Sequence, residues 1–168
     1  MDQAAEIYVS DTTAITNLAA IKRLDLLKAL FRRIVIPTAV KDELTRHGMG
    51  TLGAEEVATE TWFEVRGVGN QALVRQLRTI LDAGESEAVT LAQELNARLL
   101  IIDEYKGRQV AEKMSIRIIG VLSILVEAKR RGLVPAVKPI IQQLRDDAGF
   151  RLSDNLVFRV LSAVGESR

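Results

Sequence analysis

Residues 99–111 read LLIIDEYKGRQVA and contain the stretch that decides the fold. The first four residues form a continuous apolar run, as expected for a central parallel strand that is buried on both faces. Asp103 follows this run directly, and helical spacing of apolar residues returns over 106–114. In an open parallel sheet, ligands bind in the crevice beyond the carboxyl ends of the strands. Asp103 is therefore expected at the edge of the sheet where a functional site would lie.

The same arrangement occurs near the N-terminus, in the motif EIYVSDTTAI. An apolar strand over 7–10 ends at Asp11, and Thr12 and Thr13 follow before helical spacing begins. Asp11 alone has a structural explanation, because an aspartate at this place commonly caps the next helix. It becomes a candidate site residue if its strand is a neighbour of the strand that ends before Asp103.

Strands and helices alternate along the chain, which predicts an α/β fold with a central, mostly parallel sheet covered by helices on both faces. The expected strands are 7–10, 33–36, 62–65, 99–102 and 117–119. The expected helices are 13–21, 24–31, 38–48, 70–81, 85–95, 106–114 and 121–131, with two more between 135 and 164. Gly84 is expected to break the helix over 70–81 from the next one. The chain is expected to be a single domain, 1–168, with a core over 7–132 and a helical extension over 133–168.

The amino-acid composition limits the kinds of metal site that the chain can form. Hydrophobic residues make up 48% and charged residues 27% of the 168 positions, which fits a soluble globular protein. The absence of cysteine excludes disulfides and thiolate metal sites, and a single histidine, His47, excludes sites built from several imidazoles. A metal would need oxygen ligands, which suits Mg²⁺ or Mn²⁺. No signal peptide or membrane-spanning run is evident, so a cytoplasmic protein without a membrane partner is expected.

Further acidic residues fall near the same expected edge of the sheet. Glu43 lies in the first two turns of the helix after the second strand, and Glu85 and Glu87 open a later helix. A single acid in a first helical turn is favourable by about 0.3–1 kcal/mol without any function. Four or five acids at one end of a sheet, however, repel one another and need a cation.

Four motifs, in this order, resemble the PIN-domain nucleases. They are Asp11 with its hydroxyl neighbours, VIPTAVKDEL with Glu43, GESEAVTLA and LLIIDEYKGRQVA, and the resemblance spans residues 7 to about 132. The tail GFRLSDNLVFRVLSAVGE is similar to the PIN-like proteins of bacteria and archaea found beside small antitoxin-like partners. The resemblance implies a three-layer α/β/α PIN-like fold, a divalent-metal site and cleavage of RNA. It also implies the toxin-like role in a toxin–antitoxin pair, with RNA and a small antitoxin protein as partners.

By position, the resemblance makes Asp11, Glu43, Glu85 and Asp103 the catalytic, metal-binding acids. The chain departs from the family at the third acid, where GESEA offers two glutamates in place of the usual aspartate. Glu87 is therefore kept as a further metal ligand.

Other residues near these acids receive secondary roles. Glu104 is a substitute ligand beside Asp103. Thr12 or Thr13 resembles the hydroxyl that supports the first aspartate or positions a phosphate. Lys106 and Arg108 are candidates to meet the phosphate backbone of a substrate, although such residues are more often solvated helix positions, which is the preferred interpretation.

These residues predict a metal-dependent endoribonuclease. Two divalent ions about 3.5–4 Å apart would activate a water and stabilise the leaving oxygen. The alternative is a catalytically silent PIN-fold module that binds nucleic acid or protein. Two features favour it: the third acid departs from the family pattern, and the chain carries little net positive charge. A phosphoacceptor aspartate is a third hypothesis, and the haloacid-dehalogenase-like version is disfavoured because no second aspartate lies two residues after Asp11.

Three features have structural explanations. The loop GMGTLG, 48–53, matches GxGxxG, but it follows a helix rather than a strand and is not expected to bind a dinucleotide. His47 suits a helix end, and Ser10 lacks the partners of a hydrolase triad. The apolar faces of the last two helices predict core packing, with a surplus that would suit a homodimer interface or a groove for a partner helix.

Overall fold

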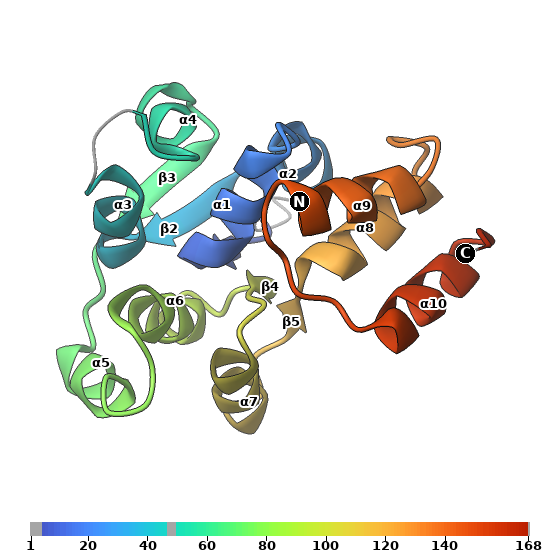
Figure 1. The fold of residues 1–168 in the computed structure, drawn as a ribbon. Helices are drawn as coiled ribbons and strands as arrows, with labels where there is room; N and C mark the ends of the chain where they lie inside the picture. Colours follow the sequence, from blue (N-terminus) through green and yellow to red (C-terminus); the bar gives the residue numbers. More distant parts are fainter. Residues whose placement is uncertain (1–4, 47–49, 168) are drawn as a thin grey trace.

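A five-stranded parallel sheet lies at the centre of the molecule, as the computed structural model of residues 5–46 and 50–167 shows (Figure 1). The strand order is β3-β2-β1-β4-β5, and every neighbouring pair is parallel. The strands are β1 (Tyr8–Ser10), β2 (Ile34–Pro37), β3 (Phe63–Arg66), β4 (Leu99–Ile101) and β5 (Ile118–Ile119). The predicted α/β class and all five predicted strands are confirmed, with bounds shifted by at most one residue.

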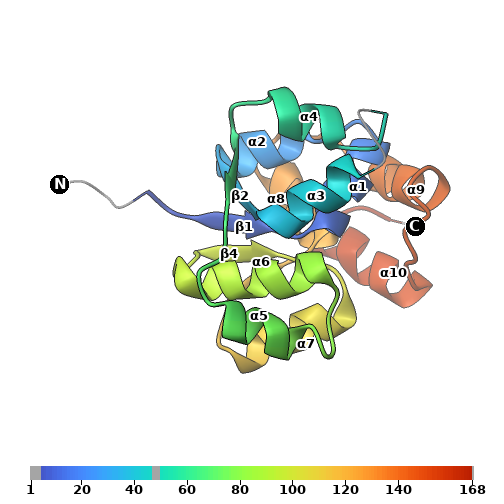
Figure 2. The ribbon, with the colours of Figure 1, turned by 90° about the vertical axis from the view of Figure 1, so that its left-hand side faces the viewer.

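Helices cover both faces of the sheet and make three layers (Figure 2). One face carries α1 (Thr12–Ala20), α2 (Asp25–Phe31), α3 (Thr38–Thr45), α4 (Ala54–Thr59), α8 (Val121–Arg130) and α9 (Lys138–Asp146). The other carries α5 (Gln71–Leu77), α6 (Ala83–Glu94) and α7 (Tyr105–Lys113). The last helix, α10 (Asp154–Ala163), packs on α8 at the side of the molecule away from α5 (Figure 1).

Alternating side chains of the strands fill two separate apolar cores. Ile34 and Ile36 of β2 point into one cluster, whereas Val35 between them points into the other. In β4, Ile101 and Leu100 divide in the same way. All of these side chains are buried because helices cover both faces, which explains why the strands are continuous apolar runs in the sequence.

The register of β1 against β4 brings two sequence-distant strand ends to one edge. Ser10 pairs with Ile101, and the backbone N–H of Asp11 donates to the carbonyl of Ile101 at 3.1 Å. The chain leaves β1 toward β2 on one side and returns to β4 on the other, so the strand order reverses here. Such a switch point opens a crevice beyond the carboxyl ends of the strands, which is where Asp11 and Asp103 follow their strands.

Two helix predictions need correction. Gly84 does not break a helix: α6 already begins at Ala83, after Asp82, whose side chain accepts from the N–H of Glu85. The short helix α4 was not predicted, and it follows Gly53, whose φ of 84° is a left-handed conformation that glycine adopts without strain.

The predicted end of the third helix at Gly48, and the role given to His47, lie outside the described residues. Of the helices that the structure describes, none has both the length and the apolar character needed to cross a membrane.

Candidate functional site

Asp11 occupies the centre of the site and is 1% exposed. It caps α1, because its Oδ1 accepts from the N–H of Ala14 at 3.1 Å. Its Oδ2 is buried and has no hydrogen-bond partner among the described residues. Burial raises the pKa of the Asp11 carboxyl well above its ordinary value, and the negative charges of Asp103 and Glu85 raise it further. Oδ1 therefore caps the helix, whereas Oδ2 is available to a ligand.

Glu43 joins three elements of the fold. It lies on α3, and its carboxylate accepts hydrogen bonds from the hydroxyl of Thr12 on α1 and from the N–H of Gly84 on α6, the latter at 2.8 Å. A Cβ at Gly84 would collide with the Glu43 carboxylate and would lie 2.9 Å from Oγ1 of Thr12. Gly84 therefore provides the room in which Glu43 reaches the start of α6.

Glu85 and Asp82 share the start of α6 in a capping box. The N–H of Glu85 donates to Asp82 at 2.8 Å, and the N–H of Asp82 donates to Glu85 Oε2 at 3.2 Å. Glu85 is 8% exposed, and burial followed by the charge of Asp82 raises its pKa. The charges of Glu104 and Glu43 act in the same direction. Glu85 thus belongs to the same electrostatic cluster as Asp11.

Asp103 lies between β4 and α7, and its side chain reaches the start of α8. Both of its carboxylate oxygens are within hydrogen-bond distance of the N–H of Val121, at 3.1 and 3.2 Å. Burial raises the pKa of Asp103 to about 6, although the Val121 N–H and the positive charge of Arg108 oppose the increase. A Cβ at Gly120 would lie 2.6 Å from Asp103 Oδ1 and 2.8 Å from an Arg108 nitrogen, so glycine is needed for this approach.

Glu87 is placed differently from the other acids. Its Oε2 accepts from the N–H of Ala39 at 2.8 Å, in the first turn of α3. It therefore stabilises the start of α3, in a position that gives it a structural role of its own.

The residues predicted to contact the substrate also differ in their surroundings. Thr12 contacts Glu43, whereas Thr13 contributes its carbonyl to the hydroxyl of Thr16. Arg108 is half-buried near Asp103, and Lys106 is exposed two residues earlier on α7. Glu104, also exposed, affects both Asp103 and Glu85 electrostatically.

Helix N-termini explain how the fold tolerates these acids. Asp11, Glu43, Glu85, Glu87 and Asp103 each accept a backbone N–H at or beside the start of a helix. Each such contact stabilises a negative charge by about 0.3–1 kcal/mol. Even so, the pKa values of Asp11, Glu85 and Asp103 remain raised. The amides compensate the burial of these three carboxylates incompletely, which leaves negative charge for a cation to neutralise.

The donor set fits a divalent ion in its chemistry. Asp11 offers a buried carboxylate oxygen without a partner, and Glu85 and Asp103 supply further oxygens that interact with it electrostatically. Hard oxygen donors are those that Mg²⁺ and Mn²⁺ prefer. Over residues 5–46 and 50–167, no three acidic side chains are already grouped closely enough to hold an ion. Binding would therefore require these carboxylates to draw together.

The raised pKa of Asp103 predicts a pH dependence of stability in metal-free protein. The folded state keeps this proton up to about pH 6, whereas the unfolded chain releases it near its ordinary value of 3.8. Since the folded state binds more protons in this window, the free energy of unfolding falls as pH rises from about 4 to 6. The loss attributable to Asp103 is about 3 kcal/mol, at about 1.36 kcal/mol per pKa unit.

Urea unfolding with EDTA across this pH window measures the effect. The difference between the wild type and Asp103→Asn isolates it, because all other titrating groups are common to both proteins. Parallel profiles for the two proteins would contradict the raised pKa.

Asp82, Gly84 and Gly120 were missed by the sequence analysis. The pattern Asp82-x-x-Glu85 is a capping-box signature and could have been recognised. The two glycines carried no local signal, because the side chains that need their space come from other parts of the chain.

Comparisons with known proteins agree with this geometry. A family model described as DUF3368, a PIN domain, matches residues 7–166. A PilT N-terminus domain protein from the hyperthermophilic archaeon Sulfolobus solfataricus has a similar fold, with a TM-score of 0.52 and 21% sequence identity. The alignment covers 73% of this chain and 93% of that one. No curated protein matches the chain. PIN domains are generally nucleases that use divalent metal ions. The family match, together with the parallel sheet and the acids at its switch point, shows that the chain belongs to the DUF3368 family of PIN domains.

Proposed function

We propose that this chain is a divalent-metal-dependent ribonuclease whose active site is the acidic cluster beyond β1 and β4. The observation that carries the proposal is the buried, unpartnered Oδ2 of Asp11, which interacts with Asp103 and Glu85 electrostatically. Isolated negative charge in such a place is costly unless it is neutralised. A captured cation would explain why the fold keeps it.

The residues of the cluster would divide the work. Asp11, Glu85 and Asp103 would hold one or two ions of Mg²⁺ or Mn²⁺, which supply an activated water and stabilise the departing oxygen of a phosphodiester. Glu43, held by Thr12 and Gly84, would position the start of α6 and complete the negative field.

Groups at the rim would contact the substrate and extend the ligand set. Arg108 and Lys106 would meet the phosphate backbone of the RNA. Glu87 of α6, whose side chain reaches the start of α3, would be the outermost ligand, and Thr13 would be a second hydroxyl near the site.

From the resemblance we also propose the biological setting. The chain would be the toxin-like component of a toxin–antitoxin pair, and it would act in the cytoplasm as a homodimer controlled by a small antitoxin protein. The order of its motifs and its similar tail support this proposal.

A Mn²⁺ titration and an RNA cleavage assay test the nuclease proposal together. Calorimetry of wild-type protein is expected to show saturable Mn²⁺ binding near neutral pH, and single-stranded RNA is expected to be cleaved with Mn²⁺ but not with EDTA. Asp103→Asn should weaken Mn²⁺ binding about tenfold or more, since second-shell losses alone cost 10- to 100-fold. Asp42→Asn, which changes an exposed residue of α3, is the matched control.

A second candidate function is a catalytically silent module that binds RNA or protein. The absence of a ready-made three-acid group in the described residues favours it. Wild-type protein that binds no Mn²⁺ near neutral pH and leaves RNA intact would favour this candidate over the nuclease.

A further inference from the structure

A hollow adjoins the acidic cluster on the side of α8 and α10. It has a volume of about 440 Å³ and is bounded by these helices and by the segment that leads into α10. Asp103, Arg108 and Gly120 lie at one end of it, so it opens onto the proposed active site. Its apolar wall consists of Leu122, Val126, Phe150, Leu152, Leu156 and Val160. A hollow of this size lies within the range of about 300–1,000 Å³ that is typical of ligand sites.

Arginines surround this hollow. Arg151 and Arg159 line it together with Arg108. Arg151 and Arg159 are exposed and form no ion pair with an acidic residue in the described part of the chain. Their neighbour Arg145, by contrast, pairs with Asp154 at 3.1 Å. Two guanidinium groups without acidic partners, beside an apolar wall, are complementary to a ligand that is anionic at one end and apolar at the other.

The apolar wall provides a surface for a planar group. Phe150 is half-buried, packs against the core and also lines the hollow. Unpaired RNA bases commonly stack on aromatic side chains, and arginines beside them hold the backbone phosphates.

We propose that this hollow is a nucleotide subsite for single-stranded RNA, next to the bond that the acidic cluster would cut. The base lies against Phe150 and the aliphatic wall, and the phosphate lies on Arg151 and Arg159. The inference deepens the proposed function and rests on it for the position of the cut. The binding of the nucleotide itself needs no metal.

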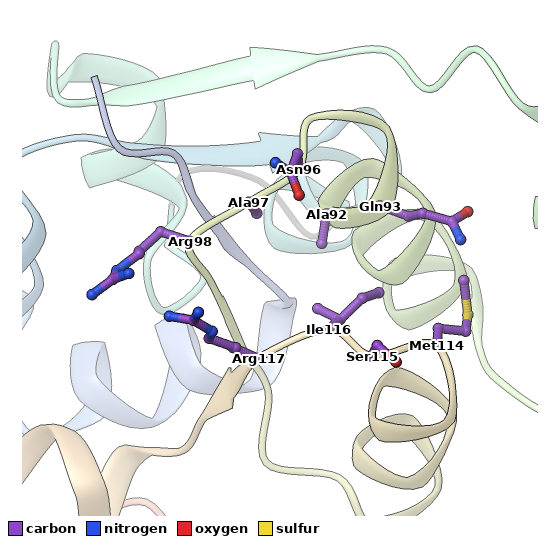
Figure 3. Close-up of a pocket in the computed structure, with 9 residues that line it drawn as sticks. All are labelled: Ala92, Gln93, Asn96, Ala97, Arg98, Met114, Ser115, Ile116 and Arg117. Carbon is purple, nitrogen blue, oxygen red and sulfur yellow. The ribbon is translucent and has the colours of Figure 1, made fainter. Parts of the chain in front are cut away.

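Another pocket gives a natural comparison. It has a volume of about 380 Å³ and lies before β4 and β5, at the opposite end of these strands from Asp103. Arg98 and Arg117 line it, and Figure 3 shows both side chains extending to the same side. It has no aromatic wall, and Arg98 already pairs with Glu6 at 3.4 Å. Arg117→Ala therefore removes one exposed arginine from a pocket remote from the proposed subsite.

Fluorescence anisotropy in EDTA separates RNA binding from cleavage. The probe is a labelled single-stranded oligoribonucleotide, titrated with full-length wild type and variants at several salt concentrations. Arg151→Ala/Arg159→Ala is expected to weaken binding at least about tenfold and to reduce the salt slope by about 0.7, the value for the loss of one phosphate contact. Phe150→Leu should weaken binding about fivefold or more without changing the salt slope, because it removes stacking alone. Arg117→Ala should change binding less than about twofold, as expected for a residue remote from the contacts.

The outcomes distinguish this inference from the nuclease proposal. Weakened binding by the hollow's variants supports the subsite even if wild-type protein cleaves no RNA with Mn²⁺, in which case the nuclease proposal fails alone. Cleavage by wild type, with variants that bind RNA as tightly as it does, overturns the subsite alone. An abasic oligonucleotide that binds as tightly as the intact one would also overturn it, because a base would then have no role. Undetectable RNA binding by the wild type has the same consequence. Thermal unfolding of each variant verifies that the fold is intact.

Discussion

Asp11→Asn is expected to stabilise the metal-free protein and at the same time to abolish Mn²⁺-dependent RNA cleavage. The substitution keeps Oδ1 as the acceptor for the N–H of Ala14, so the cap of α1 survives. It removes a buried negative charge from the vicinity of Asp103 and Glu85 and places an amide donor there instead. Relief of an unsatisfied buried group is worth about 1–3 kcal/mol. Cleavage should fall about a thousandfold or more, which corresponds to about 4 kcal/mol of transition-state stabilisation.

The two effects are measured on the same preparations. Urea unfolding in EDTA near neutral pH gives the stability change, and initial rates of RNA cleavage with saturating Mn²⁺ give the activity change. Asp42→Asn makes the same chemical change at an exposed position and should alter neither quantity appreciably. A less stable Asp11→Asn protein that still cleaves RNA would show that Asp11 serves only as a helix cap.

Opposite signs of the two effects are characteristic of a residue kept for function. A site that concentrates negative charge costs stability in the absence of its ligand, and removal of that charge commonly stabilises the fold. A purely structural cap has the reverse behaviour, since its loss costs about 0.5–2 kcal/mol without affecting ligands. Asp11 has one oxygen in each role, so the sign of the stability change decides which role dominates.

The sheet was predictable because its signal is local. The central strands β1, β2 and β4 are largely buried on both faces, so they appear in the sequence as apolar runs, and the runs of β1 and β4 end just before Asp11 and Asp103. The rule that parallel strands share one carboxyl edge then places both acids at the same edge. The pairing of Ser10 with Ile101 confirms this placement of the strands.

The directions of the acidic side chains were less accessible from sequence. They depend on where each helix begins, because one residue of shift turns a helical side chain by about 100°. Asp82 starts α6 two residues earlier than expected, and in this phase Glu85 lies in the cluster while Glu87 reaches α3. A capping box is local and can be read from the sequence, but its effect on a distant helix cannot.

The partners of Glu43 illustrate the same limit over longer distances. Its hydrogen bonds come from Thr12, 31 residues earlier, and from Gly84, 41 residues later. No local pattern relates these three positions, so only the packing of α3 against α1 and α6 reveals them. The hollow beside α10 shows the same limit. The helix itself was predictable from sequence, but its packing against α8 was not.

Gly84→Ala is expected to reduce RNA cleavage about a hundredfold or more and to lower the free energy of unfolding by about 2–5 kcal/mol. The new Cβ collides with the Glu43 carboxylate and approaches Thr12. Because the end of Glu43 is flexible, it can swing away, but it then loses its contacts with Thr12 and with the start of α6. Hydrogen bonds to a charged group are worth about 1.5–3 kcal/mol each. Alanine recovers about 1 kcal/mol of helix propensity, so the net loss from the two hydrogen bonds is about 2–5 kcal/mol.

Gly67→Ala is the matched control, because a Cβ at Gly67 meets no atom within 4 Å. Activity and stability should both stay close to those of the wild type.

The double variant Gly84→Ala/Glu43→Ala completes a cycle with the two single variants. If Glu43 acts through its hydrogen bond to the start of α6, the effects of the two substitutions on activity are strongly non-additive. Either substitution alone already removes this hydrogen bond. Full activity in Gly84→Ala, or additive losses in the double variant, would mean that the site works without Glu43 held in this position.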